Sequence, residues 1–109
     1  MIYREGDIIT TKCSDYMWPF CKHYGIVTNY NNKLCVFHNT PGKFNSAGGN
    51  IVAQPLNEFL KERCVMKVDR SNIKSKDVIK YSIDRRYIKW NMGYNCVKYI
   101  EDIKGLEKR

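Results

Sequence analysis

The chain reads His-Tyr-Gly-Ile-Val-Thr-Asn-Tyr-Asn-Asn-Lys-Leu-Cys-Val-Phe-His from residue 23 to residue 38, and the fold is organised around this segment. Two runs rich in β-branched and aromatic residues, 23–28 and 34–38, flank a polar stretch with Asn31 and Asn32 at its centre. Asparagine tolerates the left-handed backbone conformation that a two-residue hairpin turn requires. The segment therefore predicts a β-hairpin.

The predicted hairpin brings together the two histidines of the chain. With the Asn-Asn pair as the turn, Tyr30 pairs with Lys33 and Gly25 pairs with His38. His23 is then two residues from Gly25, and side chains two residues apart on a strand project from the same face. We therefore expect His23 and His38 to be diagonal neighbours on one face of a sheet. A register slip of one residue would put them on opposite faces.

Turn-forming residues and apolar runs divide the rest of the chain into short elements. Segments rich in Gly, Asn, Ser, Pro or exposed aromatics predict loops, at 13–20 and 39–50. Further strands are expected at 6–11, 51–53 and 64–68, and helices at 56–63, 76–87 and 96–104. The pattern predicts one α+β domain over residues 1–109, in which helices surround a small antiparallel sheet.

The last two predicted helices carry recognisable end signals. Ser75 is a candidate cap for the first of them, and Asn95 is a candidate N-cap for the second. Gly105 follows the expected end of the last helix. The buried stripe of that helix is expected at three apolar positions: Val97, Ile100 and Ile103.

Composition limits the classes of protein to which the chain can belong. Its 109 residues suffice for one core, and no apolar run approaches the roughly 20 residues that span a bilayer. The first seven residues contain no apolar stretch of the kind that a signal peptide needs. Five cysteines, an odd number without a CxxC pair, favour a reducing compartment over a disulfide framework. We therefore expect a cytoplasmic location.

Positive charge is concentrated in the second half of the chain. Residues 1–60 hold five Lys or Arg and four Asp or Glu, whereas residues 61–109 hold fourteen and seven. A basic surface favours anionic partners such as a membrane surface, although an ordinary solvated surface explains the charge equally well. No nucleic-acid-binding motif is present, so nucleic acid is not the expected partner. A non-catalytic basic module that binds an anionic membrane or nucleic acid is the alternative to an enzyme.

Cys96 is the residue with the clearest chemical potential. It falls in the first turn of the last predicted helix, directly after Asn95, where free backbone N–H groups and the helix dipole favour an anion. Such placement can lower a cysteine pKa to roughly 3.5–7.5. The same N–H groups can stabilise the oxyanion of an attacked carbonyl. A thiol nucleophile needs a base, and His23 and His38 are the available imidazoles.

Four segments in this order resemble the lecithin:retinol acyltransferase-like proteins, which are circularly permuted relatives of NlpC-type peptidases. They are Glu5-Gly6-Asp7-Ile8-Ile9, His23-Tyr24-Gly25-Ile26-Val27, Val36-Phe37-His38 and Tyr94-Asn95-Cys96-Val97-Lys98-Tyr99-Ile100. In that family a Gly-Asp strand opens the domain and a histidine begins the next strand. A second histidine ends the following strand, and an Asn-Cys pair starts a late helix. The resemblance covers nearly the whole chain.

The resemblance implies a permuted papain-like fold and a Cys–His–His site without a cofactor. Cys96 would be the nucleophile, His23 the general base and His38 the residue that orients His23. An acyl-cysteine intermediate would form on an acyl ester or a peptide-like amide and then pass to water or another acceptor. Val97 and Lys98 stand where the lipid enzymes carry acidic and histidine residues, which favours a hydrolase over a lipid acyltransferase.

Two further interpretations concern the surroundings of this site. Trp18, Tyr24 and Tyr94 are candidates for the wall of a substrate cleft, although ordinary packing explains such aromatics equally well. Zinc is a rival use of the histidines, because Cys21-x-His23 and Cys35-x-x-His38 offer four residues of the types that bind zinc. Residues 35 and 38 are an odd number apart, however, so their side chains would face opposite sides of one strand. We therefore expect no metal site.

Overall fold

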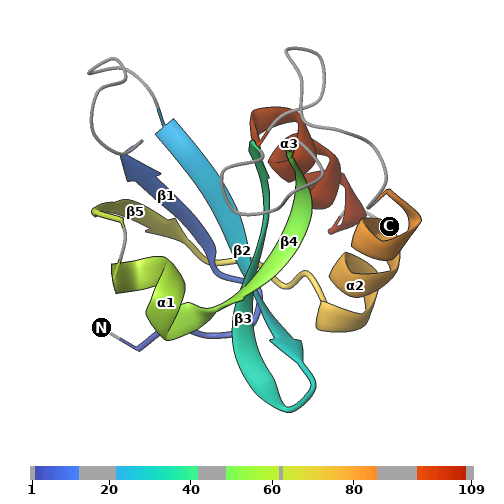
Figure 1. Ribbon diagram of the computed structural model, residues 1–109. Helices are drawn as coiled ribbons and strands as arrows, with labels where there is room; N and C mark the ends of the chain where they lie inside the picture. Colours follow the sequence, from blue (N-terminus) through green and yellow to red (C-terminus); the bar gives the residue numbers. More distant parts are fainter. Residues whose placement is uncertain (1, 13–21, 42–48, 62, 86–95, 108–109) are drawn as a thin grey trace.

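The computed structural model describes residues 2–12, 22–41, 49–61, 63–85 and 96–107, with the backbone alone for residues 40, 41, 49 and 50. These residues form an α+β domain with one five-stranded antiparallel sheet and three helices (Figure 1). The strands are β1 (Ile8–Lys12), β2 (Lys22–Tyr30), β3 (Lys33–Pro41), β4 (Gly49–Pro55) and β5 (Val65–Asp69). The helices are α1 (Leu56–Lys61), α2 (Ser75–Asp84) and α3 (Cys96–Leu106).

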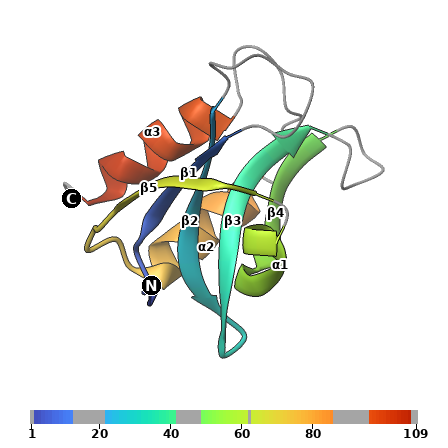
Figure 2. The same ribbon diagram turned by 90° about the vertical axis from the view of Figure 1, so that its left-hand side faces the viewer.

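The sheet has the strand order β4-β3-β2-β1-β5. Helix α1 lies on one face, and helices α2 and α3 lie on the other, as Figure 2 shows. Each of the first four strands pairs with its neighbour in sequence, whereas β5 returns to the far side of β1. The predicted kind of fold, a small antiparallel sheet with helices around it, is confirmed.

The hairpin β2–β3 has the predicted turn and register. Asn31 and Asn32 have φ angles of 53° and 63°, as a type I′ turn requires at both central positions. Tyr30 pairs with Lys33, which fixes the pairing of the two strands. Gly25 lies where a Cβ atom would collide with the Val36 side chain. Glycine at this position therefore leaves room for the Val36 side chain next to His38.

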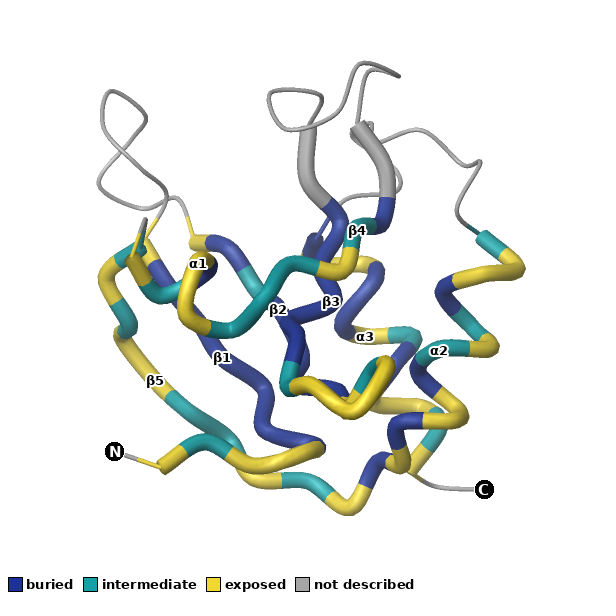
Figure 3. Tube along the Cα trace, turned by 60° about the horizontal axis from the view of Figure 1, so that its bottom comes forward, coloured by how far each residue is buried: buried dark blue, intermediate teal, exposed yellow. Residues whose placement is uncertain are grey.

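The buried residues of the described chain form two separate apolar clusters, one on each face of the sheet. Buried positions follow the central strands of the sheet (Figure 3). Strand residues alternate between the faces because successive side chains point in opposite directions. The larger cluster joins the sheet to α2 and α3, and its fully buried members include Ile26, Val78, Tyr99 and Ile103. The smaller cluster lies under α1 and consists of Ile9, Val27, Val36 and Phe59, with half-buried neighbours around them.

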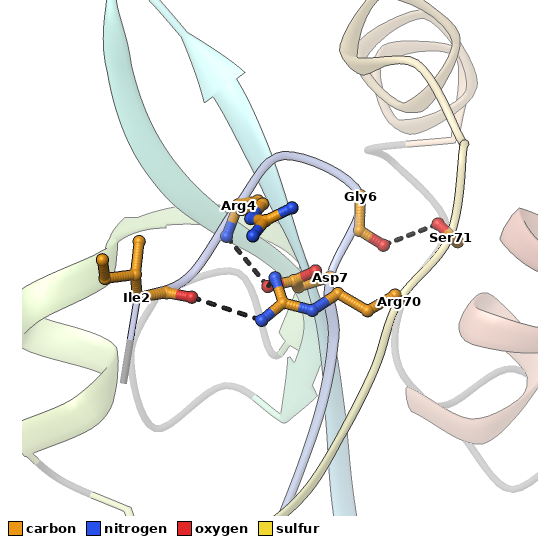
Figure 4. Close-up of polar contacts among 6 residues, drawn as sticks. All are labelled: Ile2, Arg4, Gly6, Asp7, Arg70 and Ser71. Atoms are coloured by element: carbon orange, nitrogen blue, oxygen red, sulfur yellow. Dashed lines mark hydrogen bonds and ion pairs between the residues drawn. The ribbon is translucent and has the colours of Figure 1, made fainter.

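A buried carboxylate anchors the start of β1 (Figure 4). Asp7, which is 1% exposed, accepts hydrogen bonds at 2.8 Å from the backbone N–H of Arg4 and from Nη1 of Arg70. Next to it, Ser71 donates to the carbonyl oxygen of Gly6 at 2.6 Å. Gly6 has a φ of 93°, and a Cβ there would lie 2.6 Å from the Ser71 carbonyl oxygen. These contacts join the two segments that lead into β1 and out of β5.

Several predicted boundaries need correction. The loop expected at 39–50 is shorter, because β3 continues to Pro41 and β4 begins at Gly49. These extensions pair with each other, so the polar and glycine residues there complete a ladder instead of a loop. The predicted loop at 13–20 and residues 42–48 lie outside the described residues.

The helix-end predictions are also partly wrong. Helix α2 begins at Ser75 itself. The Ser75 hydroxyl oxygen accepts a hydrogen bond from the backbone N–H of Asn29 instead of capping the helix. Gly105 lies inside α3, which continues to Leu106. Val97 is 45% exposed, because the buried face follows the 3.6-residue helical period instead of steps of three. The residues buried on that face are Cys96, Tyr99, Ile100 and Ile103.

Within the described ranges, no helix is both long enough and apolar enough to cross a membrane.

Candidate functional site

The two histidines meet on the α1 face of the sheet. Nε2 of His23 lies 2.7 Å from Nδ1 of His38, a hydrogen-bond distance, and the two ring centroids are 4.9 Å apart in an edge-to-face arrangement. The register of β2 and β3 explains this contact, since it places the two residues as diagonal neighbours on one face. The prediction that the two histidines share a face is confirmed.

Residues of β4, of α1 and of the segment after α1 enclose the histidine pair. Oε1 of Gln54 lies 3.1 Å from Nε2 of His38 and 3.3 Å from Nη1 of Arg63. The ring of Phe59 packs on both imidazoles, with its centroid 5.1 Å from that of His38 and 6.3 Å from that of His23. Together these residues form a continuous polar chain, His23–His38–Gln54–Arg63, beneath an apolar cover.

Burial keeps both imidazoles neutral. Loss of solvent, together with the positive charge of Arg63, lowers the pKa of His23 from 6.5 to about 3. The pKa of His38 is also well below its usual value, first because of burial and then because of repulsion from His23 and Arg63. The bond to Gln54 acts in the opposite direction on His38 but is the smaller influence. Near pH 7 each ring therefore has one N–H donor and one acceptor nitrogen.

Cys96 is the first residue of α3 and is buried, with 8% of its surface exposed. Its Sγ lies 3.8 Å from the carbonyl oxygen of Lys22. Burial raises the pKa of this thiol, while the backbone N–H groups of Tyr24, Cys96 and Val97 favour the thiolate and offset part of the rise. The expectation of a lowered pKa is thus wrong, because loss of solvent outweighs the helix start. The resting group is a neutral thiol.

The thiol contacts the backbone segment of β2 that carries the base candidate. Sγ of Cys96 contacts the backbone of Lys22 and Tyr24, the two residues that flank His23 in β2. The His23 ring projects toward Phe59 on the α1 face, whereas α3 packs on the Tyr24 face. Within the described residues, no hydrogen bond joins Sγ to a nitrogen of His23. The structure therefore brings the sulfur to the strand that carries the imidazole without pairing the two groups.

The remaining predicted site residues are less informative. Tyr24 is half-buried and packs against the larger apolar cluster, as ordinary packing would have it. Cys35 lies in that same cluster, whereas His38 lies on the other face, so the pair is split as its odd spacing predicts. No group of three or more candidate metal ligands occurs among the residues that the structure describes. Asn95, Trp18, Tyr94 and Cys21 lie outside those residues.

Sequence reasoning missed Gln54 and Arg63. Gln54 pairs with Val36 across β3 and β4, which places it next to His38 on the same face. Its alternation within residues 51–55 indicates a face but not a partner, since the register depends on a loop whose length the sequence leaves open. Arg63 follows α1 and lies over the Phe59 ring, with its guanidinium carbon 4.4 Å from the ring centroid. No spacing rule would have linked it to a histidine.

No protein-family model, curated protein or solved structure matches the chain.

Proposed function

We propose that the chain is a cysteine hydrolase of the circularly permuted papain-like kind, with an acyl-transfer capacity. Cys96 is the nucleophile, His23 is the general base and His38 orients the His23 ring. The substrate is an ester or an amide with an accessible carbonyl. The resemblance of the four sequence segments supports this proposal, as does an antiparallel sheet whose central hairpin carries both histidines.

The hydrogen bond between His23 and His38 is the observation that carries the proposal. A buried pair of histidines costs free energy, because each ring loses solvent and no carboxylate among the described residues compensates for that loss. Apolar residues at these two positions would fill a sheet face more favourably. The pair is held at 2.7 Å, and the backbone of β2 next to His23 contacts the thiol of Cys96 at the start of α3. A base with an orienting partner beside a helix-start cysteine is the arrangement that thiol catalysis uses.

In the proposed reaction the proton leaves the thiol as the sulfur attacks. Both groups are neutral at rest, so no thiolate–imidazolium pair is stored in the free protein. The S–H proton passes to a ring nitrogen of His23 while the sulfur forms a bond to the carbonyl carbon. The backbone N–H of Cys96 donates to the oxyanion of the tetrahedral intermediate. The imidazolium then protonates the leaving alcohol or amine, and an acyl-cysteine remains.

The second half of the reaction returns the protein to its first state. Water, or another hydroxyl or amine acceptor, loses a proton to the neutral His23 ring as it attacks the acyl-cysteine carbonyl. The C–S bond breaks, and the proton on His23 passes to the departing sulfur. Transfer and hydrolysis differ only in the acceptor that reaches the acyl group. A catalytic contact between Sγ and His23 often tightens only when substrate is bound.

Acylation by a small activated ester tests the proposal. We expect p-nitrophenyl acetate to leave an acetyl group on Cys96, detected by mass spectrometry of peptides. Replacement of the base in His23→Gln should lower the acylation rate by roughly 10²–10⁴-fold, and Cys96→Ser should abolish it. The exposed Cys64 is the internal control, and its slow acetylation should be the same in every variant.

The outcomes separate catalysis from the alternative. Equal acetylation of Cys96 in the wild type and in His23→Gln would contradict the proposed base. Cys96 acetylation no faster than that of Cys64 would contradict the proposed nucleophile. Salt-sensitive binding to anionic vesicles that persists in Cys96→Ser would then favour the basic binding module.

A further inference from the structure

We propose that Gln54 and Arg63 are positioning residues that fix the tautomers of both histidines, so that Nδ1 of His23 is the atom that accepts the thiol proton. The first part of this inference stands on the hydrogen-bond chain alone. Only the assignment of the proton acceptor rests on the proposed function. The two parts can therefore fail separately.

Arg63 sets the donor and acceptor at the first of these hydrogen bonds. A guanidinium can only donate hydrogen bonds, so the Gln54 atom 3.3 Å from Nη1 is the amide oxygen. An amide oxygen can only accept, so Nε2 of His38, 3.1 Å from the same oxygen, must carry a hydrogen. Arg63 thus prevents the Gln54 amide from turning its NH₂ group toward the imidazole.

The direction then passes from His38 to His23. A neutral imidazole has one protonated nitrogen, so Nδ1 of His38 is unprotonated when Nε2 carries the hydrogen. The 2.7 Å contact therefore has Nε2–H of His23 as its donor and Nδ1 of His38 as its acceptor. His23 is neutral as well, which leaves Nδ1 of His23 with a free lone pair. Each step follows from the one before, and the amide oxygen of Gln54 fixes them all.

The guanidinium is itself held in place. Nη1 of Arg63 also donates to the carbonyl oxygen of Phe59 at 3.5 Å, and the guanidinium lies over the Phe59 ring. The aromatic ring that covers both histidines is thus the platform on which the cation rests. Among the described residues, the titratable groups that face each other here are His23, His38 and Arg63. The fixed positive charge opposes protonation of either ring and so preserves the alternation of donor and acceptor.

Loss of the Gln54 oxygen should reverse the direction of the hydrogen bond between the two histidines. Without that acceptor, His38 can place its hydrogen on Nδ1 and donate to Nε2 of His23. His23 would then carry its hydrogen on Nδ1, and the nitrogen proposed to accept the thiol proton would be blocked. The protein can stay folded in this reversed state, since the 2.7 Å bond survives with its donor and acceptor exchanged.

The test is a ¹⁵N NMR measurement of the imidazole tautomers at pH 7. The chain has two histidines, so His23→Gln and His38→Gln assign both ring signals. In the wild type we expect both rings to be neutral with hydrogen on Nε2. In Gln54→Leu and in Arg63→Gln we expect the share of the Nδ1–H form to rise about tenfold, the effect of losing one hydrogen bond of ordinary strength. Amide spectra show whether each variant is folded.

Two matched variants separate positioning from a general effect of charge or packing. Gln54→Glu keeps an acceptor oxygen beside His38 and should keep the wild-type tautomers. Lys61→Gln removes one positive charge from the exposed end of α1 and should change neither ring. Hydrogen on Nδ1 of both rings in the wild type would overturn the inference. So would identical tautomer populations in the wild type, Gln54→Leu and Arg63→Gln.

Acetylation of Cys96 then tests the link to chemistry. In Gln54→Leu the rate should fall by the same factor as the measured fraction of His23 with a free Nδ1, because that fraction sets the rate, while Gln54→Glu stays near the wild type. If the tautomers shift as expected but the rate does not change, Nδ1 of His23 is not the proton acceptor. If, in addition, His23→Gln leaves the rate unchanged, the proposed function fails while the tautomer assignment stands.

Discussion

Acidification from pH 7 to pH 5 should lower the free energy of unfolding of this protein by much more than its carboxylates alone would cause. Both histidines have pKa values in the folded state below the 6.5 of the unfolded chain, mainly because they are buried. The unfolded state therefore binds protons at pH 5 that the folded state excludes. Stability is complete above pH 6.5 and declines as the pH falls from there toward the folded-state pKa of His23 of about 3.

The size of the loss follows from the unfolded-state pKa. Between pH 7 and pH 5, one histidine that titrates at 6.5 when unfolded and stays neutral when folded removes about 2 kcal/mol from the free energy of unfolding. The two rings together remove about 4 kcal/mol, with a slope of about 2.5 kcal/mol per pH unit near pH 5.5. Since small domains have total stabilities of about 5–15 kcal/mol, this loss is a large share. The lowered pKa of Glu5 acts only below its ordinary value of 4.5.

Urea unfolding at half-unit steps from pH 7.5 to pH 4.5, followed by tryptophan fluorescence, measures this slope. The single variants His23→Gln and His38→Gln should each lose about half of it, and the double variant, which has no histidine, should lose nearly all of it. A ring titration by NMR gives an independent reading, in which both imidazoles of the folded protein stay neutral at pH 5. A flat stability profile, or ring signals that titrate near 6.5 in the folded protein, would refute the reasoning.

Three further substitutions test the packing around the site by urea unfolding, with controls in the same chain. Gly6→Ala should cost about 1–3 kcal/mol through its positive φ, whereas Gly105→Ala, open to solvent in α3, should gain about 0.5–1 kcal/mol; equal effects would count against the φ argument. Asp7→Ala should cost about 2–4 kcal/mol, against less than about 1 kcal/mol for the surface pair member Asp69→Ala. Phe59→Ala should cost about 3–5 kcal/mol and raise the pKa of the histidines beneath it by admitting water, and an unchanged ring titration would show that Phe59 is not their cover.

The sequence predicts the central hairpin well because its determinants are local. Two asparagines specify a turn with positive φ, and that turn fixes the register of everything attached to it. The contact between His23 and His38 follows from the register by the two-residue alternation of a strand. A helix that begins at Cys96 was predicted for a similar local reason.

The missed features depend on contacts between distant segments. Serine is a residue type that often caps helices, yet the Ser75 hydroxyl accepts a hydrogen bond from the backbone N–H of Asn29 in β2. Gln54 reaches His38 only through a β3–β4 register that the sequence does not determine. The pKa of Cys96 depends on how completely the domain covers it, which the helix start alone does not reveal. Burial and long-range register are properties of the assembled chain.

The strand order also bears on when the parts of the site come together. Strands β1 to β4 pair with their neighbours in sequence, so each pairing closes a short loop and costs little chain entropy. The pairing of β1 with β5 joins Ile8 to Asp69 and is expected to form later. A growing chain could therefore assemble the histidine pair and its glutamine before the ribosome has reached Cys96. The order of synthesis would deliver the thiol to a base that is already in place.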